Sequence, residues 1–362
     1  MLEVQKYIYE NGLLSLEKDF AITLNFHEKD ERVILNYNQL ESPKLNEKVR
    51  DCRALTLNSW TGEIIARSFR RFLNWSEGTR DEMNRFNWDK CWTTEKCDGS
   101  LLLVYYWHGQ WNVQTRNSYA DGLVNGCGYT WRQIAEMAID LSKLEPVSGR
   151  TYNFELCTPY NQVVKIYKQP TAYLLTIFDG EVEWTHDAVE NFAQDFGLTR
   201  PFSVFCRDPF EVSYAVAREA ERDKRSEGFV VRDCFNARYK FKSEEYLRLS
   251  HLSNNGNICN VKHIVPIVLK GEQDEMIAYF PYIEEVVYKV DIIISDLLET
   301  LDNFWFVNSV EKSKKSFALG IEKCPLKGIL FGVYGKTYEE VDLRKELSKN
   351  LDNVIEYVKG TL

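Results

Sequence analysis

The sequence lacks any apolar stretch long enough to cross a membrane. Runs such as Val290–Ile294 are interrupted by charges well before the roughly 18 residues that a spanning helix needs. The N-terminal segment MLEVQKYIYENG mixes acids with apolar residues, unlike a secretory signal peptide. We therefore expect a cytoplasmic protein with no membrane partner.

The sequence also lacks paired cysteines. Its nine cysteines are scattered, with no C-x-x-C pair, which argues against a zinc site and against a disulfide framework. An odd number of cysteines fits reduced thiols in the cytosol. Internal repeats and low-complexity segments are absent as well.

The sequence also lacks a net positive charge. The formal charge of −9 has the wrong sign for a general nucleic-acid binder. It leaves room for an enzyme with a local basic cleft, because clusters of charge focus the field more than the net charge does.

Ordered structure is well supported by the 362 residues, of which 44% are hydrophobic and 14% aromatic. Period-two patterns predict strands within 20–38 and at 52–58, 63–69, 101–107, 111–116, 152–157, 172–179, 228–233 and 237–242. Helical periodicity is expected at 129–144, 210–224, 284–305 and 338–358, the last ending near Gly360. The fold class predicted is α+β: a mostly antiparallel body at 1–252, followed by an all-helical domain at 253–362.

The stretch TEKCDGS places Lys96 directly before an Asp-Gly turn and a buried apolar run. Lys96 is either a solvated lysine or a nucleophile. A nucleophilic amine must be uncharged, so we expect burial and neighbouring cations to lower the pKa of Lys96. We also expect Gly99 to adopt a positive φ in the turn that aims the amine.

Basic companions for Lys96 occur in ARYKFK. Arg238, Lys240 and Lys242 are spaced by two and therefore share one face of a strand. The hairpin formed by SEGFVVRD and ARYKFK should bring Glu227 close to Lys242. The acid could then bind the metal of a metal-bound nucleotide, and the lysines could bind its phosphates. An equally good interpretation is that these residues form cross-strand ion pairs on an exposed face of the sheet.

Two further groups could serve the same site. Glu155 is a carboxylate in the strand YNFELC, which is otherwise apolar or small. It either lies at a sheet edge with its hydrogen bonds satisfied, or it binds a ribose hydroxyl or a hydrated metal. Arg53 and the strand-like run ARSFRRF, in which Arg67 and Arg71 share a face, could bind phosphates or simply face water.

Together, KCDGS (96–100), FEL (154–156), SEGFVV (226–231) and KFK (240–242) resemble, in order and spacing, the motifs of covalent nucleotidyltransferases. With LNYN (35–38), DCR (51–53), RRFLNWSE (70–77) and KFKSEEYLRLSH (240–251), the chain is most similar to the bacteriophage-type RNA ligase 1 family. The resemblance implies an N-terminal adenylyltransferase domain of the ATP-grasp-like ligase type at 1–252 and a helical C-terminal domain at 253–362.

The resemblance also implies roles for individual residues. Lys96 would become adenylated. The ATP-binding positions would be Tyr37, Arg53, Arg71, Lys96, Glu155, Lys240 and Lys242. The metal ligands would be Glu155, Glu227 and Asp274, with Glu275 as an alternative to Asp274. Arg116 and Tyr246 would serve RNA binding and ligation, and Ser118 would lie near the phosphates.

The implied activity is ATP-dependent joining of 5′-phosphate and 3′-hydroxyl RNA ends, with ATP as substrate and Mg²⁺ as cofactor. Broken tRNA and an end-healing kinase/phosphatase are the implied partners, in the host cytoplasm if the protein is viral. Two alternatives remain open. One is another nucleotidyltransferase, either a DNA ligase or an mRNA capping enzyme; the other is a ligase-like protein that only binds RNA.

Overall fold

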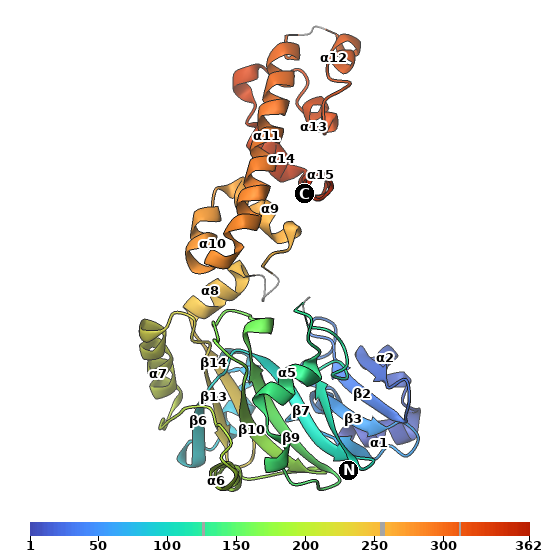
Figure 1. Cartoon of the computed structure of the whole chain (residues 1–362), viewed down its shortest axis with the longest axis vertical. Helices are drawn as coiled ribbons and strands as arrows, with labels where there is room; N and C mark the ends of the chain where they lie inside the picture. Colours follow the sequence, from blue (N-terminus) through green and yellow to red (C-terminus); the bar gives the residue numbers. More distant parts are fainter. Residues whose placement is uncertain (125–126, 254–257, 311–312) are drawn as a thin grey trace. The chain divides into compact units, whose positions relative to one another are not determined.

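A computed structural model describes residues 1–124, 127–253, 258–310 and 313–362, with the side chain of Glu275 left out (Figure 1). The chain divides into two compact units, Met1–Arg248 and Leu249–Leu362. The first unit is a mixed α+β structure with antiparallel sheets, and the second is helical, so the predicted fold class is confirmed.

The first unit contains three sheets. One four-stranded sheet consists of β1 (Ile22–Phe26), β2 (Arg32–Tyr37), β3 (Leu55–Asn58) and β4 (Ile64–Ala66), in that order. A central five-stranded sheet has the order β11 (Val182–Glu183), β10 (Thr171–Asp179), β9 (Arg150–Cys157), β7 (Ser100–Trp107) and β8 (Gln110–Thr115). The third sheet has the order β12 (Ser203–Val204), β6 (Cys91–Glu95), β13 (Gly228–Asp233), β14 (Arg238–Lys242) and β5 (Leu73–Asn74).

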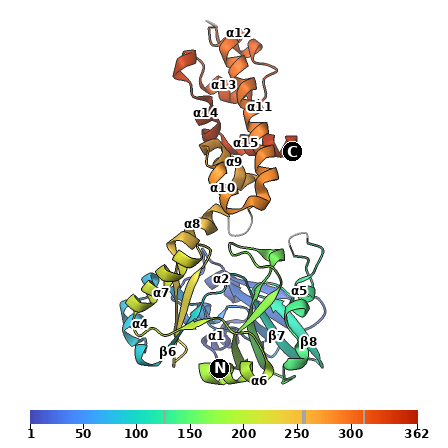
Figure 2. The ribbon, with the colours of Figure 1, turned by 60° about the vertical axis from the view of Figure 1, so that its left-hand side comes forward.

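Helices flank these sheets (Figures 1 and 2). They are α1 (Glu3–Asn11), α2 (Ser15–Phe20), α3 (Glu47–Asp51), α4 (Arg80–Arg85), α5 (Trp131–Ala138), α6 (His186–Phe196) and α7 (Pro209–Arg222). Helix α8 (Glu244–Leu252) crosses the division between the units. The second unit contains α9 (Val261–Lys270), α10 (Gln273–Tyr279), α11 (Glu284–Asn308), α12 (Lys314–Gly320), α13 (Lys327–Gly332), α14 (Leu343–Lys349) and α15 (Leu351–Thr361). In the part of the chain that the model describes, no helix combines the length and apolarity needed to span a bilayer.

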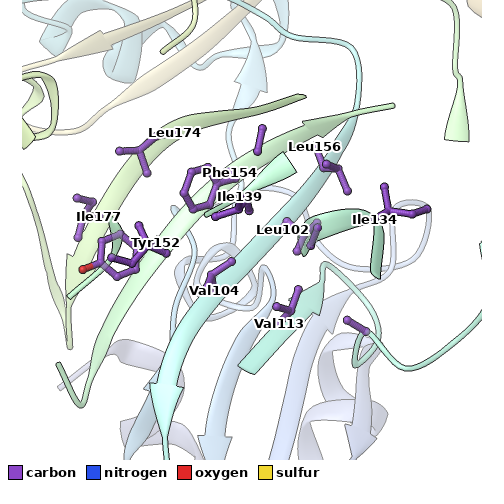
Figure 3. Packing of buried hydrophobic residues seen from close by; sticks show 14 of the residues in the cluster. Leu102, Val104, Val113, Ile134, Ile139, Tyr152, Phe154, Leu156, Leu174 and Ile177 are labelled. Atoms are coloured by element: carbon purple, nitrogen blue, oxygen red, sulfur yellow. The ribbon is translucent and has the colours of Figure 1, made fainter. Parts of the chain in front are cut away.

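The core explains why the run after Gly99 is continuously apolar. Leu102 and Val104 of β7 lie in a cluster with Ile134 of α5 (Figure 3). Residues of α6 also belong to this cluster. Leu101 and Leu103 face the opposite side, in a cluster that includes Ile65 and Ala66 of β4. Because β7 is covered on both faces, it carries no polar alternation.

One face of the third sheet packs in a hydrophobic core. Phe229 and Val231 of β13 and Tyr239 and Phe241 of β14 pack in a cluster that includes α7. The alternation predicted from ARYKFK is confirmed, so the basic residues of β14 project from the other face.

Several predicted elements differ in extent. Helix α5 covers only Trp131–Ala138 of the predicted 129–144, and the side chain of Asp140 then accepts from the Ser142 amide and starts a separate turn. The strand predicted at 63–69 ends at Ala66.

The helix predicted at 338–358 is also divided. It forms a short 3₁₀ turn followed by α14 and α15, which are separated at Asn350. The stop predicted at Gly360 is wrong, since α15 continues to Thr361.

Candidate active site

A cavity of about 540 Å³ lies on the opposite face of the third sheet, from which Lys240 and Lys242 project. Nine of the residues singled out from the sequence line it: Tyr37, Arg53, Arg71, Lys96, Arg116, Glu155, Arg238, Lys240 and Lys242. Five of them lie in β2, β9 and β14, and the other four lie in segments next to strands. The fold therefore brings together groups that are far apart in the sequence.

Lys96 follows β6 directly. Its backbone amide donates to the carbonyl of Gly228, which fixes the residue against the start of β13. Its Nζ lies 2.7 Å from Oε2 of Glu227, and Lys242 Nζ lies 2.8 Å from the other carboxylate oxygen. The predicted approach of Glu227 to Lys242 is confirmed by the register that pairs Gly228 with Lys242.

The ionisation of Lys96 differs from the prediction. Burial disfavours its ammonium, but the charges of Glu227 and Glu155 outweigh burial, so the pKa of Lys96 is raised. The expectation of a lowered pKa is wrong, because the nearest charges are acids and not cations. At neutral pH Lys96 is an ammonium ion paired with Glu227, and it must lose a proton before it can act as a nucleophile.

Asp98 joins three segments around Lys96. One carboxylate oxygen accepts from the backbone amides of Val164 and Lys165, at 2.8 and 2.6 Å. The other oxygen accepts from the hydroxyl of Tyr246 at 2.7 Å. Tyr246, in α8, is thus tied to the Lys96 segment through Asp98.

Gly99 is required for a reason that the sequence did not indicate. Its φ is not positive, so the predicted turn geometry is wrong. A Cβ at this position would instead lie 2.5 Å from the carbonyl oxygen of Leu156 and 3.0 Å from Sγ of Cys157. Glycine lets the start of β7 approach β9 closely, which brings Lys96 next to the strand that carries Glu155.

Glu155 is the carboxylate best suited to a new ligand. Burial, opposed by Lys96 and reinforced by Glu227, raises the pKa of Glu155 to about 7. Within the described residues, no hydrogen-bond or ion-pair partner contacts its carboxylate. A cation or a sugar hydroxyl would therefore find a free acceptor there.

Lys240 has the opposite perturbation. Burial, together with the charges of Arg53, Lys96 and Lys242, lowers the pKa of Lys240 to about 7. An entering polyphosphate would neutralise these cations and favour the ammonium form. The site thus holds unbalanced positive charge where an anion can bind.

The guanidinium groups are stacked on aromatic rings. Arg71 and Arg116 lie 4.0 and 4.3 Å from the ring centroid of Tyr37. Arg53 lies 4.5 Å from the ring of Phe69. Stacking holds the planar groups in place. Arg71 also donates to the carbonyls of Ser42 and Gln39, and Arg116 donates to the side chain of Asn36 and the carbonyl of Tyr37.

Three candidates lie elsewhere. Arg67 donates to the carbonyl of Glu181 and lines a second cavity, to which Arg71 also contributes. The hydroxyl of Ser118 lies 2.9 Å from that of Thr115. Asp274 is exposed in α10 of the second unit, and the side chain of Glu275 lies outside the described residues.

Part of the cavity lining was not predicted. It includes Trp92 and His186, whose stacked rings have centroids 4.9 Å apart, and Arg200 and Arg232. The alternation of Trp92 with Lys96 along β6 could have indicated Trp92. Nothing in the local sequence around His186 or Arg200 points to the cavity.

The residues present suit a hydrated divalent ion better than a protein-enclosed one. Among the described residues no cluster of three or more acids, histidines or cysteines could hold a metal. Both oxygens of Glu227 are occupied by lysines, which leaves Glu155 as the open carboxylate. Mg²⁺ typically keeps several waters and binds through one or two carboxylates plus substrate phosphates, which fits this arrangement.

Comparison with known proteins places this site in context. A family model described as RNA ligase matches residues 51–246, more than half of the chain. A protein of Autographa californica nuclear polyhedrosis virus, named as a bifunctional polynucleotide kinase/RNA ligase, is 28% identical over 79% of this chain, and the match spans 43% of that relative's length. A protein of Thermovibrio ammonificans named as an RNA ligase is 23% identical, with 84% of this chain and 75% of the relative covered. An archaeal ATP-dependent RNA ligase of known structure gives a TM-score of 0.49 at 13% identity, covering 92% of this chain and 82% of that one.

Proposed function

Since the chain belongs to the RNA ligase family, as the match over residues 51–246 and the ordered motifs within it show, we propose that it joins 5′-phosphate and 3′-hydroxyl RNA ends at the expense of ATP. The membership confirms the resemblance to the bacteriophage-type RNA ligase 1 family. One observation carries the proposal: the amine of Lys96 lies 2.7 Å from Glu227 in a cavity whose walls hold three further lysines and six arginines.

In the first step, the amine of Lys96 attacks the α-phosphorus of ATP. The new N–P bond replaces the bond to the bridging oxygen, and pyrophosphate leaves. Glu227 is the proton acceptor that the geometry supports, since it is already hydrogen-bonded to the amine. Lys240 and Lys242 neutralise charge that develops on the phosphate oxygens.

A divalent ion such as Mg²⁺, held by Glu155 and the triphosphate, would supply further neutralisation at the phosphate oxygens. Glu155 ionises around pH 7, so its affinity for such an ion increases as the pH rises through neutrality. The roles of Glu227 and Asp274 as metal ligands remain predictions.

In the second step, an oxygen of the RNA 5′-phosphate attacks the phosphorus of lysyl-AMP and releases the amine of Lys96. In the third step, the 3′-hydroxyl attacks the phosphorus of the RNA 5′-phosphate. AMP leaves and a phosphodiester bond remains. A covalent intermediate divides one difficult displacement into easier ones.

The natural substrate that we propose is broken tRNA. The baculovirus relative is named for both a kinase and a ligase, and this chain spans 43% of its length. A separate end-healing kinase/phosphatase that prepares the RNA ends therefore fits the proposal.

The test uses α-labelled ATP and Mg²⁺, followed by denaturation of the protein. We expect label on the wild-type chain and none on Lys96→Ala. Label that persists on Lys96→Ala would contradict the nucleophile, and labelling by GTP in place of ATP would favour a capping enzyme. Sealing assays with cleaved tRNA stem-loops and with nicked DNA separate an RNA ligase from a DNA ligase, and a chain that binds RNA but is never labelled would be a non-catalytic relative.

A further inference from the structure

The helical unit is divided by charge. Residues 313–336, which include α12 and α13, carry five lysines and one acid, a formal charge of +4 in a chain whose net charge is −9. Helix α11 of the same unit carries six acids and one lysine. The five lysines are Lys314, Lys315, Lys323, Lys327 and Lys336.

These lysines are available for an external partner. All five are exposed, and no carboxylate of the described residues lies within ion-pair distance of them. By contrast, Lys289 of α11 and Lys349 of α14 each pair with a glutamate on their own helix. A solvated helix face normally mixes both signs of charge, so this uncompensated group is distinct within its unit.

The lysines belong to one packed region. Phe317 of α12 contacts the rings of Phe331 in α13 and Tyr334 after it, with centroids 5.7 and 5.0 Å apart. Helices α12 and α13 accordingly lie close to each other in both ribbon views (Figures 1 and 2). This packing therefore places the lysines of α12 and α13 in one compact region of the second unit.

Helix α13 adds an independent observation. Gly328 and Gly332 are one turn apart and so lie on the same face. A Cβ at either position would meet nothing within 4 Å, and neither residue has a positive φ. Neither packing nor backbone conformation within the described chain requires glycine there, although glycine destabilises a helix relative to alanine. Glycine would be required at these two positions if the backbone of a binding partner came into close contact with this face of α13.

We propose that Lys314, Lys315, Lys327, Gly328 and Gly332, termed the α12–α13 surface, bind the sugar-phosphate backbone of the structured part of the RNA substrate. The inference rests on the proposed function, since it names the site by which the ligase would hold a folded RNA. Lysines neutralise phosphates and release counterions, and the glycine face admits the RNA backbone at short range.

The test measures binding of the full-length chain, without ATP, to a fluorescein-labelled tRNA anticodon stem-loop that is broken in its loop. Lys314→Gln/Lys315→Gln/Lys327→Gln is compared with a matched control, Lys262→Gln/Lys270→Gln/Lys345→Gln, which removes three exposed lysines of the same unit. We expect the first variant to lose about tenfold or more in affinity and about 2 units of the slope of log Kd against log salt. The control should stay close to the wild type.

Gly328→Ala/Gly332→Ala provides a second readout. We expect it to weaken RNA binding while the thermal midpoint stays the same or rises, because alanine favours the helix. Wild-type affinity and salt slope in the lysine variant would overturn the inference. Lysyl-AMP formation needs no RNA: a wild-type chain that is never labelled contradicts the proposed function, whereas the binding comparison alone decides the α12–α13 surface.

Discussion

Lys240 lies in the candidate active site as a lysine that is half ionised near neutral pH. Burial and three neighbouring cations lower its pKa to about 7. A bound triphosphate would stabilise the ammonium form and return the pKa toward the ordinary lysine value of about 10.4. Lys240 therefore couples nucleotide binding to proton binding.

We expect ATP binding to take up protons above pH 7, because Lys240 is largely neutral in the free protein and charged in the complex. The affinity for ATP should fall as the pH rises above 7, by up to about tenfold per unit. Calorimetric titrations at pH about 8, in buffers of different ionisation enthalpy, measure the uptake. EDTA is included because a divalent ion that binds Glu155 would displace a proton from its carboxyl group and would mask the uptake by Lys240.

Lys240→Gln should abolish the uptake, and Lys18→Gln, which removes an exposed lysine outside the cavity, should preserve it. A wild-type protein that binds ATP without taking up protons would contradict the assignment of this lysine to the phosphates.

Lys96 is perturbed in the opposite direction, and this sets the expected pH dependence of adenylylation. Its pKa is raised by Glu227 and Glu155 in spite of burial, so the reactive neutral amine is scarce at neutral pH. At saturating ATP, the rate of lysyl-AMP formation should increase with pH, by up to about tenfold per unit. Rapid-quench measurements with α-labelled ATP give the profile.

Glu227→Gln removes the strongest charge that raises the pKa of Lys96. We expect its rate profile to shift to lower pH, in addition to any loss of rate from the missing proton acceptor. A merely structural role for Glu227 would lower the rate equally at every pH. A wild-type rate that does not change between about pH 6 and 9 would rule out deprotonation of Lys96 as the limiting event.

At the scale of the elements, the junction of β6 and β7 depends on the absence of a side chain at Gly99. Gly99→Ala would place a Cβ 2.5 Å from the carbonyl oxygen of Leu156, so β7 and β9 must separate locally. We expect a loss of about 1–3 kcal/mol in the free energy of unfolding and a larger loss of adenylylation, because Lys96 and Glu155 lie on either side of the contact. Urea unfolding and labelling with ATP measure the two effects.

Gly122→Ala is the matched control, since a Cβ at Gly122 meets nothing within 4 Å. It should leave both stability and labelling close to wild type. Equal behaviour of the two variants would mean that the close approach at Gly99 is not required.

Elements with strong local periodicity could be predicted from the sequence, and so could the residues that their register brings together. The alternation in β14 gave the common face of Lys240 and Lys242, and the β13–β14 hairpin gave the contact between Lys242 and Glu227. The direction of the pKa shift of Lys96 could not be predicted, because it depends on the balance among Glu227, Glu155 and burial in three dimensions.

Close contacts between distant segments and breaks within helices could not be predicted from local sequence either. The need for Gly99 arises from Leu156, on a strand 57 residues further along the chain, which no local pattern can show. The break between α14 and α15 at Asn350 interrupts an amphipathic pattern that continues on both sides. Periodicity reports which face is buried, but it does not report where the backbone leaves the helix.

At the scale of the whole molecule, the two units would divide the requirements of the proposed ligation. Every residue that lines the cavity of the candidate active site lies between Tyr37 and Lys242, in the first unit. The charged α12–α13 surface lies entirely in the second. Adenylylation should therefore need only the first unit, and holding of a folded RNA should need both.

A chain that ends after Leu252 keeps α8 and the hydrogen bond from Tyr246 to Asp98. We expect this truncated chain to form lysyl-AMP at a rate comparable to that of the full chain, because all cavity groups and the contacts that orient Lys96 are retained. It should lose most of its affinity for the broken stem-loop, since the lysines of the second unit are gone. Labelling with ATP and RNA-binding titrations, with Lys96→Ala in the same truncated chain as the unlabelled control, measure both properties. A truncated chain that shows a cooperative unfolding transition but accepts no label would mean that the second unit supplies a group needed for adenylylation, for which Asp274 is the first candidate.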